Sequence, residues 1–241
     1  IFWIKSPNPG TWLARVDNYT KSTGLMSMTG YVIGLGDRHP SNMMVQRESG
    51  RVIHIDFGDS FESAKTRRLF PEKVPFRLTR MTVNAFDCAG IDGLVRKTCE
   101  AVMNVLREHK TSIIAQLEIF VHEPIFETST AAKIAAVTAA SATNEVFNSE
   151  LDDAHEESKW SPQSRNSMLD RVSKKLQGQD PSPNESYSSL NHPFDEKKSS
   201  EEDDNSESFE WDVPEQVDRL INIAINPMNY MQHYLGWCPF W

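Results

Sequence analysis

A short β-hairpin with polar residues at its open end is the feature that most constrains how this chain can fold. Two apolar runs, 43–46 and 52–55, flank a turn at 47–50, and this pattern predicts two antiparallel strands. Asn42 precedes the first run and Asp56 follows the second. Antiparallel pairing brings such flanking residues to Cα separations of about 5 Å. An amide oxygen and a carboxylate therefore converge, and hard oxygen ligands of this kind suit Mg²⁺ bound to a phosphate substrate.

A further carboxylate stands five residues before Asn42. Asp37 follows an apolar run at 31–35, and Asp56 opens an Asp-Phe-Gly triplet. This ordered spacing is typical of protein-kinase catalytic cores, where one carboxylate receives the proton of the substrate hydroxyl while an Asn and a second Asp hold the metal ions. Here His39 follows the first aspartate in the order Asp-Arg-His. His39 is therefore a candidate for contacting negative charge on the transferred phosphoryl group, either as a cation or as a neutral donor.

The segments 34–42, GLGDRHPSN, and 54–59, HIDFGD, closely resemble the phosphatidylinositol-3-kinase-related protein kinases. The resemblance implies an α+β, mainly helical fold that forms the C-terminal lobe of a phosphatidylinositol 3- and 4-kinase-like catalytic domain. It implies Ser/Thr phosphorylation with ATP and Mg²⁺ or Mn²⁺. In that reaction Asp37 is the catalytic base and His39 the transition-state donor, while Asn42 and Asp56 bind ATP through the metal ions.

The same resemblance implies partners and a location. Protein substrates and the subunits of a large growth-control complex are the expected partners, in nutrient and growth signalling, and no direct nucleic acid binding is expected. Three cysteines, odd in number and widely spaced, are typical of a reducing compartment. No apolar run approaches the roughly 18 residues of a membrane span. We expect a cytoplasmic protein, with endomembrane-associated and nuclear pools as further options.

The segment after the hairpin bears on the substrate. Residues 60–81 are rich in basic side chains and contain Pro71 and Pro75, which fix the local backbone. A kinase places its activation and substrate-docking segment here, so we assign it to 56–81. Phosphoinositide kinases share the motifs Asp-Arg-His, Asp-Phe-Gly and Val-Pro-Phe. They usually carry a denser Lys/Arg cluster just before Val-Pro-Phe, which binds the lipid head group. A protein kinase is favoured, with a phosphoinositide kinase and a non-catalytic scaffold as alternatives.

The sequence before Asp37 contains neither a Gly-rich phosphate loop nor a strand-borne lysine, and a kinase needs both. The run 7–10 predicts a turn rather than a phosphate cradle. We therefore expect a C-terminal lobe at 1–126, with its catalytic loop at 34–42, that lacks the N-terminal lobe. The 241-residue chain is expected to be inactive by itself.

Apolar residues recur at helical spacing in four stretches. These predicted helices cover residues 11–30, 92–109, 112–122 and 213–225. We expect the first to support the catalytic loop from behind. Asp92 is expected to cap the second, and Asp212 with Glu215 to form a capping box on the last. Cys88 and Cys99 are expected to be small buried hydrophobic residues.

Residues 127–208 differ in composition from the rest. Low hydrophobicity and blocks of charge predict that most of this insert is disordered. The run 195–212 holds nine acidic residues and two lysines, so it contributes −7 to the net charge of −9. Apolar residues at helical spacing predict one helix near 166–177 that docks on the lobe.

The last segment, 209–241, resembles the FATC domain of the same kinases, with a helix followed by an aromatic tail. Its last twelve residues include five aromatic side chains, whereas chain termini are normally polar and loose. We expect these rings to dock on the catalytic lobe, with contact to a partner or a membrane interface as the alternatives. Some family members carry a second cysteine shortly before Cys238. Here Met231 and His233 occupy that neighbourhood, so a disulfide switch in the tail is not expected.

Overall fold

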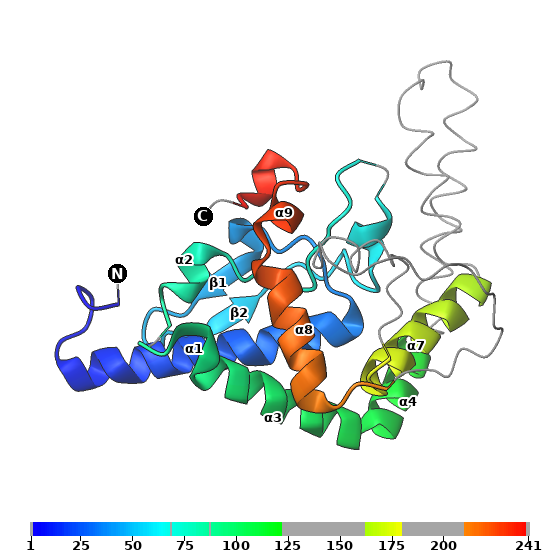
Figure 1. Ribbon diagram of the computed structural model, residues 1–241, viewed down its shortest axis with the longest axis horizontal. Helices are drawn as coiled ribbons and strands as arrows, with labels where there is room; N and C mark the ends of the chain where they lie inside the picture. The colour runs from blue at the N-terminus through cyan, green and yellow to red at the C-terminus, as the bar shows by residue number, and fades with distance from the viewer. Residues whose placement is uncertain (1, 68, 87, 122–161, 180–209, 240–241) are drawn as a thin grey trace, which may run out of the picture.

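The computed structural model describes residues 2–67, 69–86, 88–121, 162–179 and 210–239. In these residues the fold is mainly helical, with a two-stranded sheet. Figure 1 shows the long helix α1 (Pro9–Ile33) between the hairpin on one side and α3 (Leu94–Glu108) on the other. None of the described helices is both long enough and apolar enough to cross a membrane.

Helix α1 begins earlier than the apolar spacing suggests. Its first residue is Pro9, and the Asn8 side chain accepts a hydrogen bond from the Thr11 N–H at 2.8 Å. Proline suits the first helical position because its missing N–H needs no partner there. The prediction of a turn at 7–10 is therefore wrong for Pro9 and Gly10. An N-cap and a turn favour the same residue types, so composition alone does not separate them.

Helix α1 also continues past Gly30, because the apolar residues that follow it are buried in the core. Gly34 ends the helix at φ +64°, and its N–H donates to the Tyr31 carbonyl at 3.1 Å. This left-handed cap turns the chain sharply into the catalytic loop. A Cβ at Gly34 would lie 2.6 Å from the Glu62 backbone nitrogen, so the turn requires glycine.

The predicted hairpin is present. Strand β1 (Met43–Val45) pairs with the antiparallel β2 (Val52–His54), with Met43 opposite His54 and Val45 opposite Val52. Each strand is one residue shorter than its apolar run. The hydrogen bond from Ile55 N–H to the Asn42 carbonyl, at 3.1 Å, extends the pairing to the open end. The two ends that carry the candidate metal ligands are thus adjacent.

The turn of the hairpin rests on α1. Gly50 has φ +79°, and a Cβ there would lie 2.6 Å from the Arg15 carbonyl oxygen. The Asn18 amide donates to the Ser49 carbonyl at 3.0 Å, and the Ser22 hydroxyl accepts from the Val52 N–H at 2.8 Å. One face of α1 therefore positions the hairpin.

Helix α3 differs from expectation at its start. Gly93, not Asp92, is its N-cap, and Asp92 ends a short 3₁₀ turn η3 (Gly90–Asp92). Asp92 instead binds Arg96, with a 2.9 Å distance between carboxylate and guanidinium. The following helix α4 (Lys110–Val121) begins two residues earlier than predicted. Cys99 is buried against α1, but Cys88 is exposed, because it precedes the helix and its apolar stripe.

Helices from distant parts of the chain complete the core. Helix α7 (Pro162–Leu176) begins four residues earlier than predicted and buries its apolar stripe, and α8 (Val213–Ile225) packs against α3. The Asp212 side chain accepts from the Glu215 N–H at 2.8 Å, which confirms Asp212 as the cap. The main cluster includes Met28, Tyr31, Val32, Phe76, Cys99, Met103, Met168, Val172, Leu176, Val217 and Ile221. The stretches predicted to be disordered, 127–165 and 178–208, lie largely outside the described residues.

Candidate active site

The candidate metal ligands lie where the hairpin opens. Asn42 is buried at the end of the 3₁₀ turn η1 (Pro40–Asn42), and its amide nitrogen donates to the Asp37 carbonyl at 3.0 Å. The amide oxygen, on the other branch of the side chain, is then the atom that can bind a cation. Asp56 follows β2, and its carboxylate accepts from the Gly58 N–H at 3.1 Å. An amide oxygen and a carboxylate supply few, hard ligands, which fits Mg²⁺ held together with substrate phosphates.

The described residues contain no group of three or more His, Cys, Asp or Glu side chains arranged to hold a metal ion. A site built from one amide and one carboxylate is incomplete as a metal cage. It fits a cation that completes its coordination with phosphate oxygens and water, which is how Mg²⁺ binds in kinase sites. Mn²⁺ also suits carboxylate, carbonyl and water ligands.

Arg38 connects the catalytic loop to the residues that follow β2. Its side chain is 3% exposed and donates to the carbonyls of Gly36 at 2.7 Å, Ile55 at 2.8 Å and Asn42 at 3.3 Å, and also to the Asp56 carbonyl. Burial lowers the pKa of Arg38. Hydrogen bonds from an ionised donor are stronger than neutral ones, so Arg38 fixes the catalytic loop against the strand end. Sequence reasoning noted Arg38 only as part of a motif and missed this role.

Both candidate aspartates have left-handed backbones, with φ +56° at Asp37 and +58° at Asp56. A residue held in this region costs of order 1 kcal/mol or more, and such strain clusters at functional sites. At Asp37 the surroundings hold the strained backbone, because its N–H donates to the Glu72 carboxylate at 2.7 Å. Glu72 is a functional neighbour that sequence reasoning missed.

Glu72 is itself unusual. Burial raises the pKa of its carboxyl to about 7, an effect that the hydrogen bond from the Asp37 N–H opposes and the charge of Asp37 reinforces. Glu72 therefore changes its charge near neutral pH. It lies 35 residues along the chain from Asp37, so local sequence patterns give no sign of the contact.

Several polar groups surround the Asp37 carboxylate. His39 Nε2 lies 3.9 Å from Asp37 Oδ2, and Arg67 Nη2 lies 3.8 Å from the same oxygen. Arg67 makes its shorter contact, 2.6 Å, with Asp59. His39 Nδ1 accepts a hydrogen bond from the Ser41 N–H at 3.2 Å. This contact occupies Nδ1, so Nε2 is the ring nitrogen that faces the base.

The aromatic tail docks on the lobe beside this site, as predicted. Trp237 lies in the 3₁₀ turn η5 (Leu235–Trp237), is fully buried and packs with Val74 and Tyr230. The Arg77 guanidinium lies 4.5 Å from the centre of the Trp237 ring and donates to the Trp237 and Cys238 carbonyls at 2.7 and 2.8 Å. The last two residues, 240 and 241, lie outside the described part of the chain.

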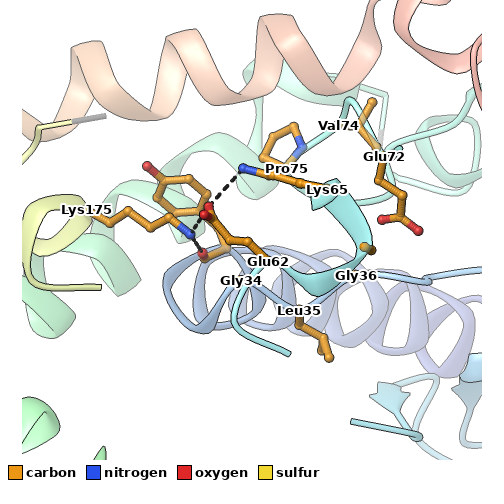
Figure 2. Close-up of a pocket in the computed structure, with 11 residues that line it drawn as sticks. Gly34, Leu35, Gly36, Glu62, Lys65, Glu72, Val74, Pro75 and Lys175 are labelled. Carbon is orange, nitrogen blue, oxygen red and sulfur yellow. Dashed lines mark hydrogen bonds and ion pairs between the residues drawn. The ribbon is translucent and has the colours of Figure 1, made fainter. Parts of the chain in front are cut away.

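A pocket behind the catalytic loop contains a carboxylate paired with two lysines, and local sequence patterns did not predict this contact. Figure 2 shows the Glu62 carboxylate between the amino groups of Lys175 and Lys65, at 2.7 and 3.0 Å. Lys175, on α7, is 2% exposed and also donates to the Tyr31 carbonyl at 2.9 Å. Burial opposes ionisation of Glu62, but the two lysines outweigh it and lower the pKa of the carboxyl to about 2. The insert helix is thereby tied to the catalytic lobe.

Residues 1–130 match the family described as Phosphatidylinositol 3- and 4-kinase, and residues 211–241 match the FATC domain. The chain therefore belongs to the phosphatidylinositol 3- and 4-kinase family.

Within this family the chain is similar to target-of-rapamycin kinases. It is 41% identical to "Serine/threonine-protein kinase TOR2" of Saccharomyces cerevisiae, over all of this chain and 9% of that protein. It is also 41% identical to "Serine/threonine-protein kinase TOR" of Oryza sativa subsp. japonica, over all of this chain and 11% of that protein. The chain thus spans about a tenth of the length of these curated relatives.

A solved structure shows the same fold. The "FAT and kinase domain of CtTel1" superposes on the whole of this chain with a TM-score of 0.68 and 28% sequence identity, and the match covers 13% of that chain. The mainly helical fold predicted for a kinase lobe with a FATC domain is confirmed.

Proposed function

We propose that this chain carries the catalytic machinery of a Ser/Thr protein kinase of the target-of-rapamycin type, which transfers the γ-phosphate of ATP to protein hydroxyls. The observation that carries the proposal is that the backbones of Asp37, Asn42 and Asp56 lie together at the open end of one hairpin, joined by the hydrogen bonds of Arg38 and Asn42. The similarity to relatives named as serine/threonine-protein kinases supports the Ser/Thr kinase type. The ending 236–241, GWCPFW, resembles the target-of-rapamycin kinases within the family.

Each residue has one role in the proposed reaction. Asp37 receives the proton of the substrate hydroxyl and orients its oxygen toward the phosphorus. Asn42 and Asp56 would hold Mg²⁺ or Mn²⁺, which would supply positive charge against the phosphates of ATP. His39 donates through Nε2 to an oxygen of the transferred group, and so stabilises the transition state. Arg38 holds the catalytic loop next to Asp56.

The domain boundaries form part of the proposal. We place the catalytic lobe at 1–126, with its catalytic loop at 34–42 and its activation segment at 56–81. The insert spans 127–208, with α7 docked on the lobe, and the FATC domain spans 209–241. The family matches at 1–130 and 211–241 support these limits.

We infer that the partners are protein substrates and the subunits of a target-of-rapamycin complex, in the cytoplasm and with an endomembrane-associated or nuclear pool. Tail contact with a membrane is also part of this inference. It is supported by the exposed apolar side chains of Met228, Met231 and Leu235, which are 63, 66 and 82% exposed on the surface of the docked tail. No role in nucleic acid binding is proposed.

A competition between two substrates tests the proposal. The full-length kinase that carries this chain is offered radiolabelled ATP with a Ser/Thr peptide and, in the same tube, vesicles containing phosphatidylinositol. The expected result is label in the peptide, with little in lipid. Label mainly in lipid would favour a phosphoinositide kinase, the alternative that shares the Asp-Arg-His and Asp-Phe-Gly motifs. Label in neither, with intact nucleotide binding, would favour a scaffold.

A further inference from the structure

We propose that Tyr234, in the C-terminal tail, is a positioning residue for the catalytic base and fixes which oxygen of Asp37 meets the substrate. Its hydroxyl donates to Asp37 Oδ1 at 3.1 Å, across 197 residues of sequence. This inference rests on the proposed function, because it assigns Asp37 as the base. It makes the tail part of the active site as well as a docked element.

The two oxygens of the Asp37 carboxylate have different surroundings. Oδ1 accepts from Tyr234, while Oδ2 faces His39 Nε2 at 3.9 Å and Arg67 Nη2 at 3.8 Å. These last distances exceed those of hydrogen bonds, so Oδ2 remains available to accept the proton of a substrate hydroxyl. With Oδ1 held, the carboxylate is restrained from rotating about its terminal bond, and Oδ2 stays directed to the side where His39 lies.

The structure holds the Tyr234 ring firmly enough for this role. The Tyr234 carbonyl accepts from the N–H of the buried Trp237 at 3.1 Å, and the ring packs on the cluster that includes Val74 and Trp237. The ring lies directly over Gly236, where a Cβ would sit 2.5 Å from its Cε2 carbon. The absence of a side chain at Gly236 therefore provides the space in which the Tyr234 ring lies.

The direction of the hydrogen bond is also fixed. Burial and the nearby charge of Asp37 raise the pKa of the Tyr234 hydroxyl to about 12. The phenol therefore stays protonated at neutral pH, so it donates and the carboxylate accepts. Tyr234 therefore donates to the base and does not compete with it for the substrate proton.

The tail offers a matched control for a test. Tyr230 lies four residues before Tyr234, and its hydroxyl is buried and accepts from the Leu78 N–H at 3.0 Å, away from Asp37. Tyr230→Phe and Tyr234→Phe each remove one phenolic oxygen from the same segment. Only the second removes a contact with the base. Gly236→Ala keeps the phenol but displaces its ring.

The experiment measures kcat and KM for a Ser/Thr peptide and for ATP in the full-length kinase. Tyr234→Phe is expected to lower kcat about tenfold, the order of one hydrogen bond to a charged group, with the KM for ATP unchanged. Gly236→Ala is expected to lower kcat similarly. Tyr230→Phe is expected to lower the melting temperature, because the Leu78 N–H is left unsatisfied, while kcat is kept.

The outcomes separate this inference from the proposed function. If the unaltered kinase does not phosphorylate the peptide, the proposed function fails. If the unaltered kinase phosphorylates the peptide, two results overturn the positioning role. One is an unchanged kcat in Tyr234→Phe, and the other is a loss of activity in both Tyr→Phe variants that parallels their loss of stability. A rise in kcat or a lower KM for peptide would also overturn it, because the phenol would then be occupying the place of the substrate hydroxyl.

Discussion

Arg77 should be the main anchor of the C-terminal tail, and replacing it with methionine should release the tail and weaken the lobe. Arg77→Met leaves the carbonyls of Trp237 and Cys238, now bonded at 2.7 and 2.8 Å, without their donor. Each unsatisfied buried carbonyl costs about 1–3 kcal/mol. Loss of the cation over the Trp237 ring, at 4.5 Å, costs about 0.5–2 kcal/mol more. The expected destabilisation is on the order of 3–6 kcal/mol after the methionine regains some packing.

Thermal melting and limited proteolysis of the full-length kinase measure this effect. A loss of at least 3 kcal/mol lowers the melting temperature of a lobe of this size by roughly 6 °C or more, and a released tail is cut faster by protease. Arg80→Met is the matched control, because Arg80 lies three residues on and is exposed. It should change stability by no more than about 0.5 kcal/mol. Equal melting of the two variants, with an equally protected tail, would refute the anchoring role.

Two further predictions concern buried carboxylates. The pKa of Glu72 is about 7 in the fold, above its ordinary value of 4.5, so its contribution to stability is complete below pH 4.5 and is lost as the pH rises through 7. The unaltered protein should therefore lose stability between pH 5 and pH 8 that Glu72→Gln does not lose, by up to roughly 3 kcal/mol. Chemical unfolding of both proteins at pH 5 and at pH 8 measures this. The same difference in unfolding free energy between the two proteins at both pH values would contradict it. Lys175→Met leaves the buried Glu62 with weaker partners and should cost about 3 kcal/mol. The pKa of Glu62 is about 2, so the contribution of Glu62 to stability is present above pH 4.5 and lost as the pH falls through 2. Acid unfolding of Lys175→Met should therefore begin at a higher pH than acid unfolding of the unaltered protein. An unchanged acid transition would show that Lys175 is not the main partner of Glu62.

The hairpin and the candidate ligands could be predicted because the information is local. Two apolar runs, a turn with glycine and the spacing of Asp37, Asn42 and Asp56 all lie within about twenty residues. The register then follows from the length of the turn that joins the two strands. The errors at helix ends arise because one residue type suits several local roles. Asp92 is a good capping residue by type, but the chain places Gly93 at the cap and uses Asp92 to bind Arg96.

The contacts that tune the site could not be predicted, because they join residues far apart in the sequence. Glu72 reaches the Asp37 N–H across 35 residues, Lys175 reaches the Tyr31 carbonyl across 144, and Tyr234 reaches the Asp37 carboxylate across 197. Their partners depend on how the helices and loops pack. A lysine or tyrosine on a polar stretch is usually solvated, so the residue type alone gives no signal.

In the proposed reaction Asp37 receives the proton of the substrate, while Asn42 and Asp56 bind the nucleotide through the metal ion. The most direct test is peptide phosphorylation by full-length Asp37→Asn kinase, measured beside the affinity of the same variant for ATP in the presence of Mg²⁺. We expect turnover to fall about 10²–10⁴-fold, as for a missing acid–base group, while the affinity for ATP stays within about twofold of the unaltered enzyme because the metal ligands are intact. Turnover within a few-fold of the unaltered enzyme, or a loss of activity that follows a loss of ATP binding, would contradict the assignment.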